Sequence, residues 1–148
     1  MNLEMTYYYD LLLIHAGCTL FMMGLIWMVQ VVHYPLFAHV GIRDYQQYQW
    51  LHMQRITWIV APIMIIEFIS ASILLIMNHS PSSTFVSTGF ILLLLIWLST
   101  FFFQVPAHSQ LSRAWDEQAH TRLVWSNWIR TMAWSIRGIV ALYLLRIY

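Results

Sequence analysis

Apolar residues fill four long stretches of the chain, and polar residues are concentrated in the connections between them. The stretches cover roughly residues 11–32, 56–77, 84–105 and 124–146. A helix of about 20 apolar residues is long enough to cross the ~30 Å hydrocarbon core of a bilayer. The pattern therefore predicts an all-α fold, a four-helix antiparallel transmembrane bundle that forms a single integral membrane domain over residues 1–148.

The three connections differ in length and in the structure that we expect for them. Residues 78–83 are few and polar, which predicts a tight turn between the second and third helices. Residues 34–55 form a longer connection that contains proline, glycine and several aromatic residues. Residues 106–123 place apolar and charged side chains on opposite sides of a helix, so we expect a short interfacial helix before the fourth span.

Composition and charge support a membrane protein and indicate its orientation. Hydrophobic residues make up 60% of the chain and charged residues 9%, whereas soluble domains carry about 25% charged residues. The formal net charge of +1 gives no reason to expect nucleic acid as a partner. By the positive-inside rule, the arginine-rich connections face the cytoplasm and both termini lie outside it, in the inner membrane if the protein is bacterial. The arginines in or beside these connections are Arg43, Arg55, Arg113, Arg122 and Arg130.

Polar side chains recur where the apolar stretches meet the two longer connections. In an antiparallel bundle all of these positions lie at one edge, which the charge pattern makes the cytoplasmic edge. Polar groups are costly near a membrane interior, so such a cluster favours a functional site. The candidate catalytic residues at this edge are His33, His52, Arg55, His108, Asn127 and Arg130.

Several chemistries fit these residue types. The three imidazoles of His33, His52 and His108 could ligate a metal ion (iron, copper or zinc) and leave a position open for water or substrate. Two of them on facing helices could instead hold one haem b. They could also act as general acids and bases, with the two arginines stabilising an oxyanion and the asparagine orienting the substrate. Alternatively, each histidine is an interfacial residue that is bonded to a backbone carbonyl.

A second group of polar residues lies deeper in the apolar stretches. Glu67 lies well inside the second stretch, and Arg137 lies at a comparable depth in the fourth. Because a lone charge there is costly, we expect the two side chains to form a buried polar pair. The pair is either structural or takes part in proton transfer or binding. His15 and His33 are 18 residues apart, which is five α-helical turns and predicts that they share a face.

The ends of the first and third stretches are similar to each other. The first ends in Gln30-Val31-Val32-His33-Tyr34-Pro35 and the third in Gln104-Val105-Pro106-Ala107-His108. Duplication of a helical hairpin would explain the similarity, and so would chance. The remaining histidines of the connections, His39, His79 and His120, are expected to be solvated.

The last third of the chain carries two runs that resemble a known family. The run from Arg122 to Thr131 is similar to a tryptophan and N-x-x-R-T motif of the anthrone-oxygenase-like family of small four-helix membrane proteins. The run from Val105 to Leu111 is similar to the V-P-x-N-x-x-L run of that family, with His108 where the family usually has Asn. The resemblance implies a four-helix membrane fold and, for some fungal members, oxygenation of a polycyclic anthrone to a quinone. By matching position it implies site roles for Asn127 and Arg130.

The leading functional hypothesis is a small integral membrane redox enzyme, oxygenase-like, that acts on a hydrophobic aromatic or quinone-type molecule at the His and Arg edge. One alternative is a transporter or proton-conducting subunit that uses Glu67 and Arg137, and four short spans would require an oligomer for this. Another is a non-catalytic assembly subunit of a membrane complex. The expected partners are the lipid bilayer and a hydrophobic small molecule, together with further copies of the chain in the transport alternative.

Overall fold

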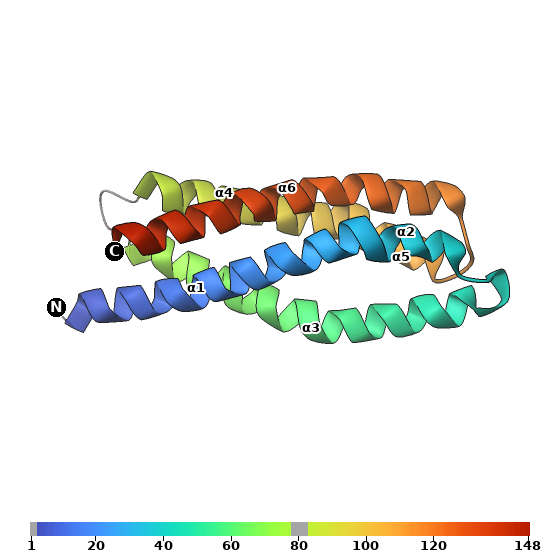
Figure 1. The fold of residues 1–148 in the computed structure, drawn as a ribbon, viewed down its shortest axis with the longest axis horizontal. Helices are drawn as coiled ribbons and strands as arrows, with labels where there is room; N and C mark the ends of the chain where they lie inside the picture. The colour runs from blue at the N-terminus through green and yellow to red at the C-terminus, as the bar shows by residue number, and fades with distance from the viewer. Residues whose placement is uncertain (1–2, 78–82) are drawn as a thin grey trace.

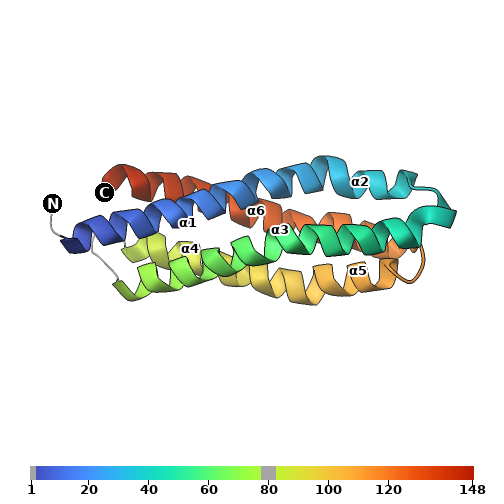
Figure 2. The ribbon, with the colours of Figure 1, turned by 90° about the horizontal axis from the view of Figure 1, so that it is seen from below.

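Four long helical rods lie side by side in the computed structural model, which describes residues 3–77 and 83–148 (Figure 1). Both termini lie at one end of the bundle, and α2 and α5 lie at the opposite end in both views (Figures 1 and 2). No strand occurs among the described residues. The first rod is α1 (Leu3–Met28), the π-helix η1 (Val29–His33), α2 (Tyr34–Leu36) and the 3-10 helix η2 (Phe37–His39); the second is α3 (Ile42–Met77); the third is α4 (Ser83–Ser99), the π-helix η3 (Thr100–Gln104) and α5 (Val105–Leu111); the fourth is α6 (Glu117–Ile147).

Three of the rods are long and apolar enough to cross a membrane. By length and composition these are Met5–His39, Ile42–Met77 and Ser83–Leu111. The predicted all-helical bundle is therefore confirmed, and three of its members have the character of spanning helices. The fourth rod, α6, is the most polar because it carries Asn127, Arg130 and Arg137 on its buried face.

The connections are shorter than the sequence pattern predicted. α3 begins at Ile42, so most of the predicted connection 34–55 belongs to helices. The separate interfacial helix predicted over residues 106–123 is wrong, because α5 continues the third rod to Leu111 and α6 begins at Glu117. Two apolar side chains of this segment, Leu111 and Leu123, are fully buried in the bundle core, and the partly buried Trp115 packs against it. The amphipathic pattern therefore reports packing against the other rods rather than against lipid.

A capped turn starts the fourth rod. The carboxylate of Asp116 accepts a hydrogen bond from the backbone N–H of Ala119 at 2.9 Å. This is the usual role of an aspartate at a helix N-cap, where it satisfies one of the free N–H groups of the first turn. The same bond holds the pKa of Asp116 below its ordinary value.

A π-helical turn interrupts the first and third rods at equivalent places. Each turn has five residues, and a proline is the second residue after it, Pro35 after η1 and Pro106 after η3. Proline has no N–H to donate and crowds the preceding turn, and π-bulges are a common way to absorb this. Each turn also holds a buried glutamine that donates to α6: Gln30 to the Val124 carbonyl at 3.1 Å, and Gln104 to Ser126 Oγ at 2.8 Å. The similarity seen in the sequence thus extends to local structure.

The rods pack in the order α1, α3, α4, α6 around the bundle, with α6 against both α4 and α1. The core has a larger cluster towards the end with α2 and α5, which includes Phe37, Leu123 and Trp134, and a smaller one near the termini. Large apolar side chains also cover the outside: Trp58 on α3 is 83% exposed. Isolated exposed apolar residues are ordinary, but whole exposed faces of this kind are typical of surfaces that meet lipid or partners.

Candidate functional site

The three predicted site histidines lie together at the end of the bundle opposite the termini. His33 is the last residue of η1, His52 is in α3 and His108 is in α5. His33 Nε2 and His52 Nδ1 are 2.8 Å apart, and the ring centroids of His52 and His108 are 5.6 Å apart. The buried ring of Phe37 contacts all three, with centroid distances from 5.0 to 6.4 Å. Three segments far apart in sequence therefore build one imidazole cluster.

Two neighbours fix the hydrogen positions on His108. The amide nitrogen of Gln49 lies 2.7 Å from His108 Nδ1, and the hydroxyl of Tyr34 lies 2.9 Å from His108 Nε2. Since an amide N–H donates, Nδ1 accepts, and the neutral ring carries its proton on Nε2. That proton is donated to the Tyr34 oxygen. The hydroxyl hydrogen of Tyr34 is then free to be donated to another group.

Arg130 enters the same region from α6 and is buried, with 6% of its surface exposed. Its Nη1 donates to Asn127 Oδ1 at 3.2 Å, and its guanidinium lies 5.2 Å from the centroid of the Trp134 ring. Asn127 is itself held by Gln30, whose Oε1 accepts from Asn127 Nδ2 at 2.9 Å. Within residues 3–77 and 83–148, Arg130 Nε has no hydrogen-bond partner and Arg130 forms no ion pair. A buried guanidinium without a carboxylate is an unusual and costly arrangement.

A small cavity is shared by Arg130 and His52. It has a volume of about 30 Å³, and its polar wall consists of Tyr34, His52 and Arg130. This is room for roughly two water molecules. The remaining wall is aliphatic and includes the half-buried Leu25, Ile56 and Val60, which separate the cavity from the outside between α1 and α3.

The geometry gives the metal prediction no support. Among the described residues, no group of three or more His, Cys, Asp or Glu side chains could hold a metal ion. Four of the six ring nitrogens of His33, His52 and His108 contact each other, Tyr34 or Gln49. The arrangement is a hydrogen-bonded cluster of three imidazoles, one phenol and one amide.

Arg55 does not lie at the site, contrary to the expectation from the sequence. The inward face of α3 carries His52, Ile56 and Val60, whereas Arg55 is exposed on the outer face near Trp58. Both faces of this helix are apolar, so hydrophobicity alone gave no sign of its rotation. From His52, a helical stripe can continue three residues later at Arg55 or four residues later at Ile56. In the structure the inward face continues at Ile56.

Sequence reasoning also missed several residues of the site. Gln30, Tyr34 and Gln49 orient the predicted residues, as described above. His120, expected to be solvated, lies in α6, and its Nε2 donates to the Tyr34 carbonyl at 2.8 Å. One signal was available: His120 precedes Asn127 by seven residues and so lies on the same helical stripe. His39 is exposed, and His79 lies outside the described residues.

The expected pair between Glu67 and Arg137 is present in the middle of the bundle, with Nη2 and Oε1 2.9 Å apart. Glu67 also accepts from the Thr19 hydroxyl at 2.8 Å and from Trp134 Nε1 at 3.1 Å. Arg137 Nη1 donates to the carbonyl of Gly89. All four rods therefore contribute to one buried polar cluster.

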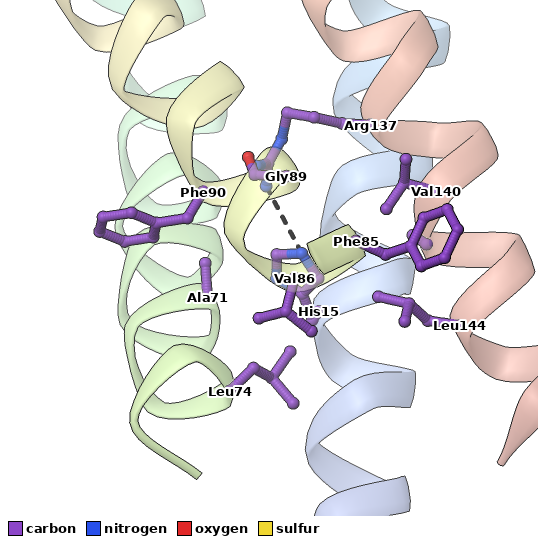
Figure 3. A pocket seen from close by; sticks show the side chains of 11 residues that line it. His15, Ala71, Leu74, Phe85, Val86, Gly89, Phe90, Arg137, Val140 and Leu144 are labelled. Atoms are coloured by element: carbon purple, nitrogen blue, oxygen red, sulfur yellow. Dashed lines mark hydrogen bonds between the residues drawn. The ribbon is translucent and has the colours of Figure 1, made fainter. Parts of the chain in front are cut away.

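A neutral histidine completes this cluster next to a cavity of about 20 Å³. Figure 3 shows His15 and Arg137 directed towards each other, with 3.5 Å between Arg137 Nη2 and His15 Nε2. Since guanidinium only donates, Nε2 accepts, and His15 Nδ1 donates to Ser70 Oγ at 2.9 Å. Ser70 in turn donates to the Glu67 carbonyl. In this series of hydrogen bonds, from Arg137 through His15 and Ser70 to the Glu67 carbonyl, each side chain has a partner.

No family model, no curated protein and no solved structure matches the chain.

Proposed function

We propose that the chain is an integral membrane protein whose four rods all cross the bilayer. The three apolar rods have the required length and composition. The charged residues in the middle of α6, Arg130 and Arg137, face the interior of the bundle. On the outer face they would be in contact with lipid, which is energetically costly for a charge. Exposed apolar side chains on every rod support the same placement, among them Phe21, Trp58, Leu98 and Ile139.

We further propose that the His and Arg130 cluster is the active site of a small membrane enzyme for a weakly acidic, hydrophobic aromatic or quinone-type molecule. The observation that carries this proposal is the unpaired, buried guanidinium of Arg130 on the wall of a cavity shared with His52 and Tyr34. A positive charge held there without a carboxylate is suited to stabilise an anion that forms during the reaction.

His52 is the best placed base in this site. Its Nδ1 contacts His33 Nε2, and its Nε2 has no protein partner in the described part of the chain. If His52 Nδ1–H donates to His33, the lone pair of His52 Nε2 is free to accept a proton. His33 then stabilises the imidazolium that results. The Tyr34 hydroxyl is a second donor for the substrate oxygen.

The resemblance to the anthrone-oxygenase-like family suggests the reaction, since Asn127 and Arg130 occupy the matching positions. The ring methylene opposite the carbonyl loses a proton to His52, the negative charge is delocalised through the fused rings onto the carbonyl oxygen, and Arg130 holds this enolate oxygen. The carbanion reacts with O₂, and the resulting carbon-bound hydroperoxide loses water to leave a carbonyl. In balance, one CH₂ and one O₂ give one C=O and one H₂O, with the proton returned by His52.

The substrate would enter from the bilayer. The aliphatic side chains of Leu25, Ile56 and Val60 close the cavity on its outer side. A tricyclic ring is much larger than 30 Å³, so these side chains and the adjoining turns of α1 and α3 must move for it to bind. A route through lipid suits a substrate that partitions into membranes.

The experiment uses the full chain in detergent with a tricyclic anthrone as probe. Absorbance under anaerobic conditions measures formation of the bound enolate, and an oxygen electrode measures turnover. We expect His52→Gln and Arg130→Gln each to lower turnover by 10²-fold or more, in the range for loss of a general base or an oxyanion donor. His39→Gln and Arg55→Gln are the matched controls because both native side chains are exposed.

Equal activity of the site and control variants would refute the proposal. Elemental analysis and a visible spectrum of the same preparations test the cofactor alternatives. Stoichiometric iron, copper or zinc that is lost in His33→Ala and His108→Ala would replace the acid and base mechanism with a metal centre. A Soret band would indicate haem.

The alternative functions make different predictions. A proton-conducting oligomer requires flux in liposomes that is lost in Glu67→Gln, with no dependence on Arg130. An assembly subunit requires neither flux nor turnover. The saturated hydrogen bonding of Glu67 supports a structural role for it, which is why we place the enzyme first.

A further inference from the structure

A groove of about 310 Å³ lies on the outside of the bundle, between the end of the third rod and the first turns of α6. We propose that this groove binds one anionic phospholipid, with the lipid phosphate at Arg122 and an acyl chain along Phe102, Phe103 and Trp125. The inference rests on the proposed membrane location and is independent of the proposed enzyme activity.

The polar end of the groove is preorganised. Arg122 Nη2 donates to Gln110 Oε1 at 3.0 Å, and Gln110 Nε2 donates to Asp116 Oδ2 at 2.5 Å. The other oxygen of Asp116 accepts from the Ala119 N–H, and the carboxylate attracts Arg122 through space, which helps to orient the guanidinium without an ion-pair contact. Arg122 itself is exposed and forms no ion pair within residues 3–77 and 83–148. An oriented guanidinium of this kind matches a phosphate.

The apolar end of the groove lies deeper in the rod. Phe102 and Phe103 are exposed in η3, roughly 10 Å before Gln110 along the helix axis. They belong to the apolar stretch Ser83–Leu111, and Gln110 lies next to its end. The exposed ring of Trp125 flanks the groove on α6. The order from charge to aromatic surface is therefore the order of headgroup and acyl chain in one leaflet, as in aromatic belts at the membrane interface.

The arginine at one end of the groove and the aromatic side chains at the other together favour an anionic phospholipid as the ligand. A free phosphate would use Arg122 and leave the aromatic surface bare, whereas a zwitterionic lipid would bring a second, positive charge to the guanidinium. An anionic phospholipid satisfies both ends of the groove at once. Charge attraction to anionic lipid is worth about 1 kcal/mol per basic residue near the surface.

The test is native mass spectrometry of the full chain in detergent, titrated with phosphatidylglycerol and with phosphatidylcholine. We expect one phosphatidylglycerol to be retained in preference, and Arg122→Gln to weaken its binding by about fivefold, the equivalent of the ~1 kcal/mol above. Arg113→Gln is the control, since Arg113 is exposed in the turn at the same end of the bundle. Equal retention of both lipids, or the same loss in Arg113→Gln, would overturn the proposal.

Two further measurements separate the lipid from other sources. Phe103→Ser should weaken phosphatidylglycerol and leave helicity unchanged, because the ring is exposed. Displacement of the lipid by millimolar inorganic phosphate, together with no effect of Phe103→Ser, would assign the site to a free anion and contradict the proposal. Extraction of cell membranes with alkaline carbonate tests the membrane location separately, since a protein released by this treatment is not integral.

Discussion

Two buried arginines on α6, Arg130 and Arg137, lie seven residues apart and have opposite surroundings. Arg137 binds the Glu67 carboxylate through Nε and Nη2, and it also contacts Gly89 and His15. Arg130 is held by the neutral side chains of Asn127 and Tyr34 and by the face of Trp134. Among the residues that the structure describes, the charge of Arg137 is balanced by a carboxylate and the charge of Arg130 is not.

On the proposed function, this difference separates a structural cluster from a binding site for an anion. A buried ion pair with all its hydrogen bonds made contributes mainly to the specificity of packing, and here it fixes the register of four rods. A buried charge without a counter-ion lowers the free energy of unfolding, and other interactions of the fold must offset this. Such residues are concentrated at functional sites. Trp134 joins the two clusters, since its ring faces Arg130 and its Nε1 donates to Glu67.

The largest effect on stability is expected for Arg137→Met. The variant leaves the Glu67 carboxylate buried without its cation, which typically costs about 3–5 kcal/mol. Reversible unfolding in mixed detergent micelles, followed by circular dichroism, measures the loss. The double variant Glu67→Leu and Arg137→Met should recover much of it, because the unpaired charge is then gone. A loss below about 1 kcal/mol in the single variant would show that the pair is dispensable.

The sequence was sufficient to predict that the three histidines meet at one end of the bundle, because this follows from the order and direction of the helices alone. Four apolar stretches of spanning length require antiparallel rods, and this brings His33, His52 and His108 to one edge. The pairing of Glu67 with Arg137 follows from matching depth in the second and fourth rods, which lie diagonally across the bundle and point their charged side chains into its interior. Neither inference needs the rotation of any helix.

Helix rotation is the part that the sequence could not supply. Ile56, Trp58 and Ile59 are all apolar, yet only Ile56 faces the interior, and so Arg55 was placed on the wrong face. The shared face predicted for His15 and His33 agrees with the structure, since both contact α3, at Ser70 and at His52. The π turn over Val29–His33 interrupts the 3.6-residue period just before His33 without turning this side chain away from α3.

A loss of stability of intermediate size is expected when the buried threonine of each cluster, Thr19 or Thr131, is replaced by valine. Thr19 donates to the charged Glu67 at 2.8 Å, whereas Thr131 donates to the neutral Gln30 at 3.4 Å and to the Asn127 carbonyl at 3.1 Å. Hydrogen bonds to charged groups contribute about 1.5–3 kcal/mol and neutral ones about 0.5–1.5 kcal/mol. Thr19→Val should therefore destabilise more than Thr131→Val in the same unfolding assay. Equal losses would mean that the charge of Glu67 adds nothing to the cluster.

The smallest change in stability is expected for Arg130→Met, although it is the same substitution on the same helix as Arg137→Met. Removing an unpaired buried charge relieves its desolvation cost, while methionine keeps most of the packing against Trp134. We expect a change within about 1 kcal/mol, in either direction, because the relief offsets the lost bond to Asn127. The enolate signal of the bound anthrone should disappear in this variant and persist in Arg55→Met. A destabilisation as large as that of Arg137→Met would mean that Arg130 has a structural counter-charge after all, and the site would lose its reason to bind an anion.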